Sequence, residues 1–323
     1  MRPLEAPSLA DVEAARERIA GLAIRTPLVR LPVDVPASDP PEIWLKLENL
    51  QPIGSFKLRG AGNAMALAGG DAVAGGVYTA SAGNMAQGVA WCARRLGVPC
   101  RVVVPEHAPR TKLDAIARLG GVVVPVPFET WWQVLQRHGH PGEGGFFVHP
   151  VADAAVIAGN GTIGLEIARD LPDVDAVVVP YGGGGLISGI AAAVRALRPD
   201  VRVYAAEVET AAPLAASLEA GEAREVERTP SWVDGIGGKG VLPEMWPMVR
   251  SLVDASLVVS LDQVADAVRT LALRARVVAE GAGAAPVAAA LAGLAGGGRV
   301  VCVVSGGNID AGTLATILAG GTP

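Results

Sequence analysis

Short apolar runs that end at turn-forming residues alternate with amphipathic stretches along most of this chain. The apolar runs predict buried strands at residues 43–47, 76–79, 100–104, 122–126, 176–179, 201–206 and 300–304. Between them, apolar residues recur every three or four positions and predict helices at residues 85–96, 111–119, 187–197, 262–276 and 286–294. Strands and helices in alternation are typical of mostly parallel sheets covered by helices, so the expected fold class is α/β.

The chain is long and apolar enough for a large core. It has 323 residues, of which 50% are hydrophobic and 18% charged, so a disordered chain is excluded. This length favours two lobes. We expect residues 1–67 plus 152–323 to form a large lobe and residues 68–151 a small one. The run 127–150, rich in glycine and proline, is expected to be an irregular crossing or surface insertion.

Charge and hydropathy exclude several classes of partner. The formal net charge of −5 gives no electrostatic reason to expect nucleic acid or an anionic membrane. Glycine, proline or charge interrupts every apolar segment before a membrane-spanning length, and the N-terminus lacks the basic start and apolar run of a signal peptide. Cys92, Cys100 and Cys302 form no CxxC pair and suit reduced thiols. A cytoplasmic protein is therefore expected.

A glycine-rich loop follows one predicted strand and precedes a predicted helix. It consists of Gly182, Gly183, Gly184, Gly185 and Leu186. Such a loop lets backbone N–H groups converge on an anion at the start of a helix, which favours phosphate binding. A tight turn is the alternative, although four glycines exceed what a turn requires. The loop satisfies neither G-x-G-x-x-G, because Ser188 replaces the third glycine, nor the P-loop pattern.

Two further segments follow predicted strands, where ligands bind in open α/β sheets. The first consists of Ser81, Ala82, Gly83 and Asn84. Its N–H groups could hold a carboxylate, or its polar side chains could cap the next helix. The second begins at Ser305, which offers one hydroxyl beside two glycines and taken alone indicates only a loop.

Lys57 follows Phe56 and an apolar stretch. Desolvation in such surroundings disfavours the charged form of a lysine and favours the free amine that imine chemistry needs. A surface lysine that lays its stem along apolar surface is the alternative.

Taken in order, these segments resemble the fold-type II pyridoxal-phosphate family, and within it the serine/threonine dehydratases and serine racemases. The resemblance runs from about residue 23 to near the C-terminus. Its markers are ENLQPIGSFKLRGA, SAGNMAQGVA, IAGNGTIGLEI, PYGGGGLISG, DGIGG, EGAGA and SGGN. The resemblance implies a two-lobed open α/β sandwich like that of the tryptophan synthase β chain, pyridoxal 5'-phosphate as cofactor, and a homodimer.

The resemblance also implies site residues. Lys57 would hold the cofactor as a Schiff base and act as general base, and Ser305 would meet the pyridine nitrogen. The other cofactor contacts would come from Phe56, Asn84, Gly182, Gly183, Gly184, Gly185, Leu186, Gly235 and Glu280. The substrate carboxylate would be held by Ser81, Ala82, Gly83 and Asn84, with Met85 beside them in place of the usual histidine.

The implied reaction is a β-elimination that converts a β-hydroxy-α-amino acid, L-threonine or L-serine, to a 2-oxo acid and ammonia. A neutral Ser305 at the pyridine nitrogen favours prompt elimination over transamination. Ala82 stands where the racemases place a second serine, which favours dehydration over racemisation. Met85 leaves an unusual substrate open as an alternative: 3-hydroxyaspartate, phenylserine or a hydroxyectoine-derived amino acid.

No metal site is expected. The racemase branch needs a Glu, a carbonyl and an Asp after the strand 201–206; Glu207 is present, but Pro213 falls about where the Asp should be. The four histidines have no metal-ligand spacing and are expected on the surface or in loops: His107, His138, His140 and His149.

The main alternative from another class is an NAD-binding oxidoreductase. The strand 176–179, the glycine loop and a second strand ending at Glu207 mimic the ribose-binding arrangement of that fold. The missing third glycine and the unexplained Lys57 segment argue against it.

Overall fold

The computed structural model describes residues 4–36 and 39–323. Residues 1–3 and 37–38, which fall in the predicted large lobe and include the start of the N-terminal stretch, lie outside the described part. The larger of two sheets has six strands in the order β1-β2-β10-β7-β8-β9. These are β1 (Leu28–Arg30), β2 (Pro41–Leu47), β7 (Ala176–Pro180), β8 (Arg202–Val208), β9 (Ala255–Val259) and β10 (Gly298–Val304). All neighbours are parallel except β1 and β2.

Helices cover both faces of the six-stranded sheet. Alternate residues of β10 show this. Val300, Cys302 and Val304 pack against α11 (Leu261–Thr270) and α12 (Gly281–Leu291), whereas Val301 and Val303 pack against α7 (Ala154–Asp170) and α8 (Gly185–Leu197). The helices around this sheet are α1 (Leu9–Arg18), α7 (Ala154–Asp170), α8 (Gly185–Leu197), α9 (Pro213–Ala220), α10 (Trp246–Leu252), α11 (Leu261–Thr270), α12 (Gly281–Leu291) and α13 (Ala311–Leu318).

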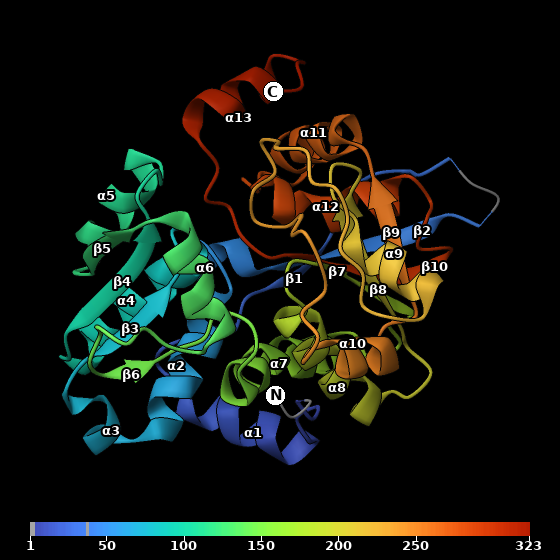
Figure 1. The fold of residues 1–323 in the computed structure, drawn as a ribbon. Coiled ribbons are helices and arrows are strands. Elements are labelled where there is room, and N and C mark those ends of the chain that lie inside the picture. The colour runs from blue at the N-terminus through green and yellow to red at the C-terminus, as the bar shows by residue number, and fades with distance from the viewer. Residues whose placement is uncertain (1–3, 37–38) are drawn as a thin grey trace.

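The second sheet has four parallel strands in the order β5-β4-β3-β6 and lies on the left in Figure 1. Its strands are β3 (Val77–Ala80), β4 (Cys100–Pro105), β5 (Val122–Val126) and β6 (Phe146–Phe147). The helices around it are α2 (Lys57–Ala68), α3 (Gly70–Ala74), α4 (Asn84–Leu96), α5 (Arg110–Arg118) and α6 (Phe128–Gln136). The α/β fold class is confirmed, and the strands of the two sheets fall on either side of the predicted lobe boundaries, whose positions stay a prediction.

Three local predictions are wrong. The predicted helix 286–294 begins earlier, at Gly281, and ends at Leu291, with Pro286 inside it. The run 127–150 is not wholly irregular, because α6 packs Val134 against Val103 of β4, and Phe146 and Phe147 form β6 beside β3. The predicted helix 262–276 ends at Thr270 and continues as a single π-helical turn, Leu271–Ala275. All seven predicted strands are present, with ends within two residues of those expected.

Two smaller observations bear on the class of protein. Within residues 4–36 and 39–323, no helix is long and apolar enough to cross a membrane. The three cysteines are buried free thiols.

Candidate active site

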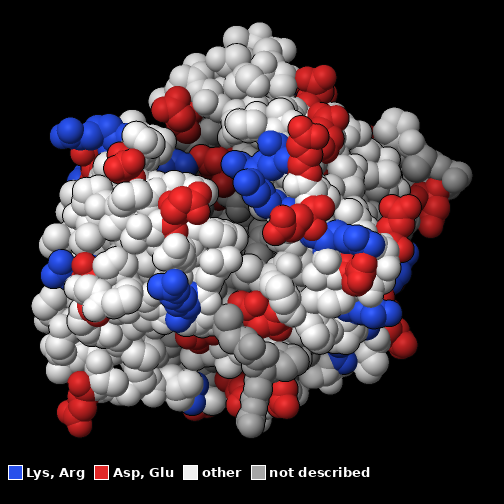
Figure 2. All heavy atoms as spheres, in the orientation of Figure 1, with Lys and Arg blue, Asp and Glu red and all other residues white. Residues whose placement is uncertain are grey.

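A cavity of about 930 Å³ opens at the carboxyl ends of strands from both sheets. Figure 2 shows the molecule hollowed near its centre, with basic and acidic side chains along the upper rim. Every residue predicted to contact cofactor or substrate lines this cavity: Phe56, Lys57, Ser81, Ala82, Gly83, Asn84, Met85, Gly182, Gly183, Gly184, Gly185, Leu186, Gly235, Glu280 and Ser305. The structure therefore brings the predicted set together, while the role of each residue stays a prediction.

Lys57 is the first residue of α2, and its half-buried side chain lines this cavity. The Nζ atom donates to the carbonyl oxygen of Pro150 at 3.2 Å and lies 5.0 Å from the centroid of the Phe56 ring. Burial lowers the pKa of Lys57 from 10.5 to about 8, against the opposing charge of Glu280. The alternative of a surface lysine is wrong, and Lys57 has a larger free-amine fraction near neutral pH than an ordinary lysine, reaching about half near pH 8.

The glycine loop joins β7 to α8, and close packing explains its composition. A Cβ atom on Gly183 would lie 2.6 Å from a methyl of Val151, and one on Gly185 would lie 2.8 Å from the Val151 carbonyl oxygen. Gly184 has a φ of 95°, a conformation that favours glycine. No side chain of the described residues caps the N-terminus of α8. The loop therefore offers an uncapped helix start that an anion such as phosphate fits.

The segment after β3 is not a helix cap. The residue that precedes α4 is Gly83, no side chain of the described part caps that helix, and the Ser81 hydroxyl instead accepts from the Gly83 N–H at 3.2 Å. The Asn84 amide donates to Glu280 Oε1 at 2.8 Å and accepts from the Asn308 amide at 2.8 Å. Asn84 is thus oriented by residues from the opposite wall of the cavity.

Glu280 stands directly before α12 and is buried in the cavity wall. Its pKa is raised to about 7, mainly by burial and in addition by the charge of Asp234, while the hydrogen bond from Asn84 opposes the increase. Ser305 follows β10, and its carbonyl oxygen accepts from the Phe56 N–H at 3.0 Å. This bond ties the residue before Lys57 to the end of β10.

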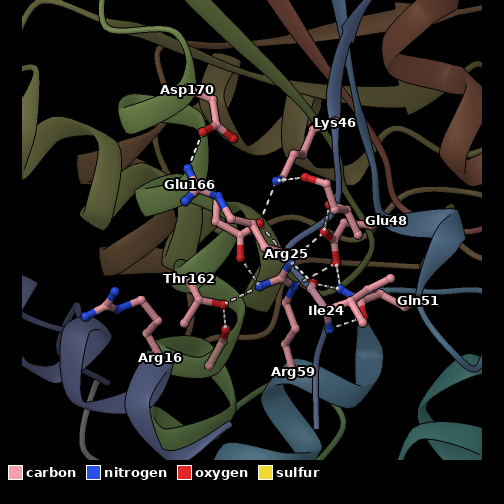
Figure 3. Close-up of polar contacts among 12 residues, drawn as sticks. Arg16, Ile24, Arg25, Lys46, Glu48, Gln51, Arg59, Thr162, Glu166 and Asp170 are labelled. Atoms are coloured by element: carbon pink, nitrogen blue, oxygen red, sulfur yellow. Dashed lines mark hydrogen bonds and ion pairs between the residues drawn. The ribbon is translucent and has the colours of Figure 1, made fainter. Parts of the chain in front are cut away.

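A buried ionic cluster supports α2 and was not predicted from the sequence (Figure 3). Arg59, two residues after Lys57, contacts Glu48 Oε2 at 2.8 Å and Glu166 Oε1 at 2.7 Å, and Lys46 contacts Glu166 Oε2 at 2.5 Å. Burial alone would raise the pKa of Glu48, but the charge and hydrogen bonds of Arg59 lower it overall. The four residues come from three distant segments, so no spacing in the sequence indicates the cluster.

Four more residues line the site, and none of them is among the residues predicted to contact cofactor or substrate. Asn160 lines the cavity from α7, and its amide donates to the Gly185 carbonyl oxygen at 3.4 Å. Trp131 also lines the cavity but belongs to α6 rather than to an irregular stretch. Lys112 and Asp234 form an ion pair at the cavity lining. The cavity thus has a wider polar and aromatic lining than the motifs indicate.

The histidines lie in loops, as expected. His149 lies in a loop that is buried, because only 4% of its surface is accessible.

Glu207 does not serve the arrangement that an NAD-binding fold requires. Its carboxylate accepts from the N–H groups of Leu214 and Ala215 at 2.9 and 2.8 Å and from the Ser256 hydroxyl at 2.6 Å. The side chain therefore caps the start of α9, is 1% exposed, and does not line the cavity. The Glu207 carboxylate is therefore occupied by contacts within the protein and is not available to a ribose.

Comparison with known proteins places this cavity in context. The family model described as pyridoxal-phosphate dependent enzyme matches residues 19–306. The chain is 42% identical over 310 residues to L-threonine ammonia-lyase of Thermotoga maritima, covering 94% of this chain and 76% of that protein. It is 38% identical over 309 residues to the catabolic L-threonine dehydratase of Staphylococcus aureus, covering 94% and 89% of the two chains.

Solved structures give the same picture of the fold. Maize serine racemase superposes with a TM-score of 0.85 at 32% identity, covering 98% of each chain. The threonine deaminase isoform 2 of Solanum lycopersicum, in its processed form, superposes with a TM-score of 0.84 at 29% identity, covering 99% of this chain and 92% of that one.

Proposed function

The chain belongs to the family of pyridoxal-phosphate-dependent enzymes, and on this premise we propose that it is an ammonia-lyase (dehydratase) that converts L-threonine or L-serine to a 2-oxo acid and ammonia. One observation carries the proposal: the Lys57 amine, with a pKa of about 8, lies in the same cavity as the uncapped glycine loop and Ser305. The names of the relatives, threonine ammonia-lyase and threonine dehydratase, support the substrate class.

The cavity fits pyridoxal 5'-phosphate. The cradle at Gly183 and Gly185, which a Cβ atom would fill, leaves backbone N–H groups at the start of α8 for the phosphate. Asn84 and Ser305 would meet polar atoms of the ring, the Phe56 side chain its face, and Lys57 its aldehyde carbon. When bound, this cofactor supplies an electron sink that makes the substrate Cα–H bond acidic.

Lys57 Nζ takes the proton from Cα as general base. Its lowered pKa gives the free-amine fraction that this role needs near neutral pH, and the Pro150 carbonyl holds the nitrogen in place. The loop Ser81–Asn84 binds the substrate carboxylate through the N–H groups of Ala82 and Asn84, since those of Ser81 and Gly83 donate to the Val103 carbonyl oxygen and to Ser81 Oγ. Ser305 contributes a neutral hydroxyl, which favours loss of the β-substituent over transamination.

Two cavity residues, Ala82 and Met85, limit which reaction and which substrates we expect. Ala82 has no exchangeable proton to deliver to the opposite face of Cα, so elimination is favoured over racemisation. Met85 is 2% exposed and packs in the core beside the four-stranded sheet, which favours its packing role over a widened pocket for an unusual amino acid. L-Threonine and L-serine are therefore favoured as substrates over 3-hydroxyaspartate, phenylserine and the hydroxyectoine-derived amino acid.

The proposal also covers the division into lobes, the oligomeric state and the cellular compartment. We propose a small lobe at residues 68–151, a large lobe at residues 1–67 plus 152–323, a homodimer, and a cytoplasmic location. Light scattering coupled to gel filtration checks the dimer.

A substrate panel tests the activity. Purified protein with cofactor is incubated with L-serine, L-threonine, 3-hydroxyaspartate and phenylserine, and 2-oxo acid is measured. We expect 2-oxobutyrate from L-threonine and pyruvate from L-serine, and neither from a Lys57→Ala variant. Failure on all four substrates, with exchange of the Cα hydrogen for solvent deuterium intact, would contradict elimination and indicate racemisation or β-replacement.

A further inference from the structure

His149 closes a short turn in the chain between β6 and α7. Its Nδ1 atom accepts the backbone N–H groups of Val151 at 3.1 Å and Ala152 at 2.7 Å. A nitrogen that accepts two hydrogen bonds carries no proton, so the proton of the ring resides on Nε2. Nε2 lies 3.2 Å from the carbonyl oxygen of Leu135 and donates to it. The contacts thus select one neutral tautomer.

The surroundings of the His149 ring keep it neutral and fixed. Burial is the main cause that lowers its pKa to about 3, and the nearby charges of His138 and Lys57 act in the same direction. The ring stacks on that of His138, with 4.3 Å between centroids, and meets the Phe147 ring edge-on at 5.9 Å. His138 in turn lies 3.6 Å from Glu244 Oε1. His149 is therefore held by aromatic contacts as well as by its hydrogen bonds.

The turn that His149 closes contacts both halves of the cofactor site. The Pro150 carbonyl oxygen accepts from Lys57 Nζ at 3.2 Å. The Val151 side chain and carbonyl fill the space that a Cβ atom on Gly183 or Gly185 would occupy. Two consecutive residues thus contact the reactive amine and the proposed phosphate cradle.

We propose that His149 is a positioning residue for the lyase reaction. By accepting two backbone N–H groups, its Nδ1 atom sets the turn 150–152, and this turn places the Lys57 amine relative to the glycine loop. His149 acts through Pro150 and Val151 and does not itself line the cavity. The expected effect of His149 on catalysis rests on the proposed function. The role of His149 in closing the turn does not.

Two substitutions separate the roles of the two ring nitrogens. In His149→Asn, the side-chain oxygen stands near the position of Nδ1 and can still accept from Val151 and Ala152. In His149→Gln, the amide stands near the position of Nε2, which keeps the contact with Leu135 and loses the Nδ1 acceptor. Both variants lose the stacked ring, so a role in packing alone affects them equally. His107→Gln, at an exposed loop histidine, is the matched control.

The variants are compared as holoenzymes by kcat, KM and thermal unfolding. We expect His149→Gln to lose kcat by about 10- to 100-fold with KM changed less than about 3-fold, because misplacing a reacting group slows the chemical step. His149→Asn should keep kcat within about 3-fold of the unchanged protein at a similar loss of Tm. Equal losses of kcat in both variants, in step with Tm, would overturn the proposal.

Two measurements do not depend on activity. In cofactor-free protein, amide hydrogen exchange at Val151 and Ala152 should accelerate in His149→Gln and not in His149→Asn. Nitrogen-15 chemical shifts of the unsubstituted protein should show one protonated nitrogen on His149, unchanged across the neutral pH range, which lies above the pKa of about 3. A His149 that titrates in this range, or exchange that is equal in the two variants, overturns the turn-closing role. A protein with no lyase activity but the expected exchange pattern overturns the proposed function alone.

Discussion

Asn84 donates its side-chain N–H to the Glu280 carboxylate at 2.8 Å, and 196 positions separate the two residues in the chain. The bond joins the start of α4, beside the four-stranded sheet, to the start of α12, which covers the six-stranded sheet. Asn308 donates to the other side of the same amide, so the orientation of Asn84 is determined. Because Glu280 also affects the pKa of Lys57, this bond connects the wall of the cavity to its reactive amine.

The pKa of Lys57 is directly measurable in cofactor-free protein. Acylation of Lys57 by acetic anhydride, followed by peptide mass spectrometry, should show a midpoint near pH 8, since burial lowers the pKa to about 8. Glu280→Gln removes a charge that raises this pKa, so its midpoint should lie below that of the unchanged protein. The exposed Lys239 serves as the internal reference for reagent reactivity. A midpoint near the ordinary lysine value of about 10.4, or a higher one in Glu280→Gln, would contradict the assignment.

Burial of the charged Lys57 amine lowers the stability of the cofactor-free protein. Its pKa is about 8 in the folded state and 10.5 ordinarily, so the folded state binds fewer protons between these values. The cost is present in full below pH 8 and fades as the pH rises to 10.5. Lys57→Met should raise the free energy of unfolding by about 1–3 kcal/mol near neutral pH, and by less near pH 10.5, in urea titrations. A gain that is the same at both pH values would refute this cause.

The Arg59 cluster should behave as a buried ionic network. Arg59→Met leaves Glu48 and Glu166 without their main partner, and the expected loss is about 3–5 kcal/mol in the free energy of unfolding. Arg16 pairs with Glu13 on the exposed surface of α1, so Arg16→Ala should change stability by less than about 1 kcal/mol. Chemical denaturation of both variants checks the contrast. Similar losses would mean that burial of the cluster has no energetic consequence.

Gly183 tests the packing of the phosphate cradle. Gly183→Ala places a methyl 2.6 Å from the Val151 side chain, so the loop must shift and cofactor affinity should fall by about 10-fold or more. Adding Val151→Ala should restore part of the affinity, because it removes the two nearest methyls. Gly70→Ala, where a Cβ meets nothing within 4 Å, is the control. Cofactor titration followed by absorbance measures all three. An unchanged affinity in Gly183→Ala would show that the cradle is not built by this contact.

Much of the fold and of the site could be predicted from the sequence. The strands were found because each contains a run that is mostly apolar, and those buried on both faces, such as β7 and β10, give the clearest runs. The residues around the cavity follow strand ends, and parallel strands bring their ends together. Lys57, Asn84 and Ser305 could be assembled into one site on that ground and on the family motifs.

What escaped prediction depends on contacts between distant segments. The cluster around Arg59 needs β2, α2 and α7 to be folded together before its charges meet. His149 shows no pattern in the sequence that distinguishes it from the exposed His107, since its burial comes from α6 and β6. The helix α6 was missed for two reasons. The run 127–150 contains many glycines and prolines, and a helix of nine residues is too short to show a clear repeat of apolar positions.

The central claim is that Lys57 carries the cofactor, and borohydride reduction of the purified holoenzyme tests it most directly. The protein should be yellow, reduction should bleach it, and peptide mapping should find the mass of one reduced pyridoxal phosphate on the peptide that contains Lys57. Lys57→Ala, treated in the same way, should carry no label. A colourless protein that binds NAD, or a label on any other lysine, would contradict the claim.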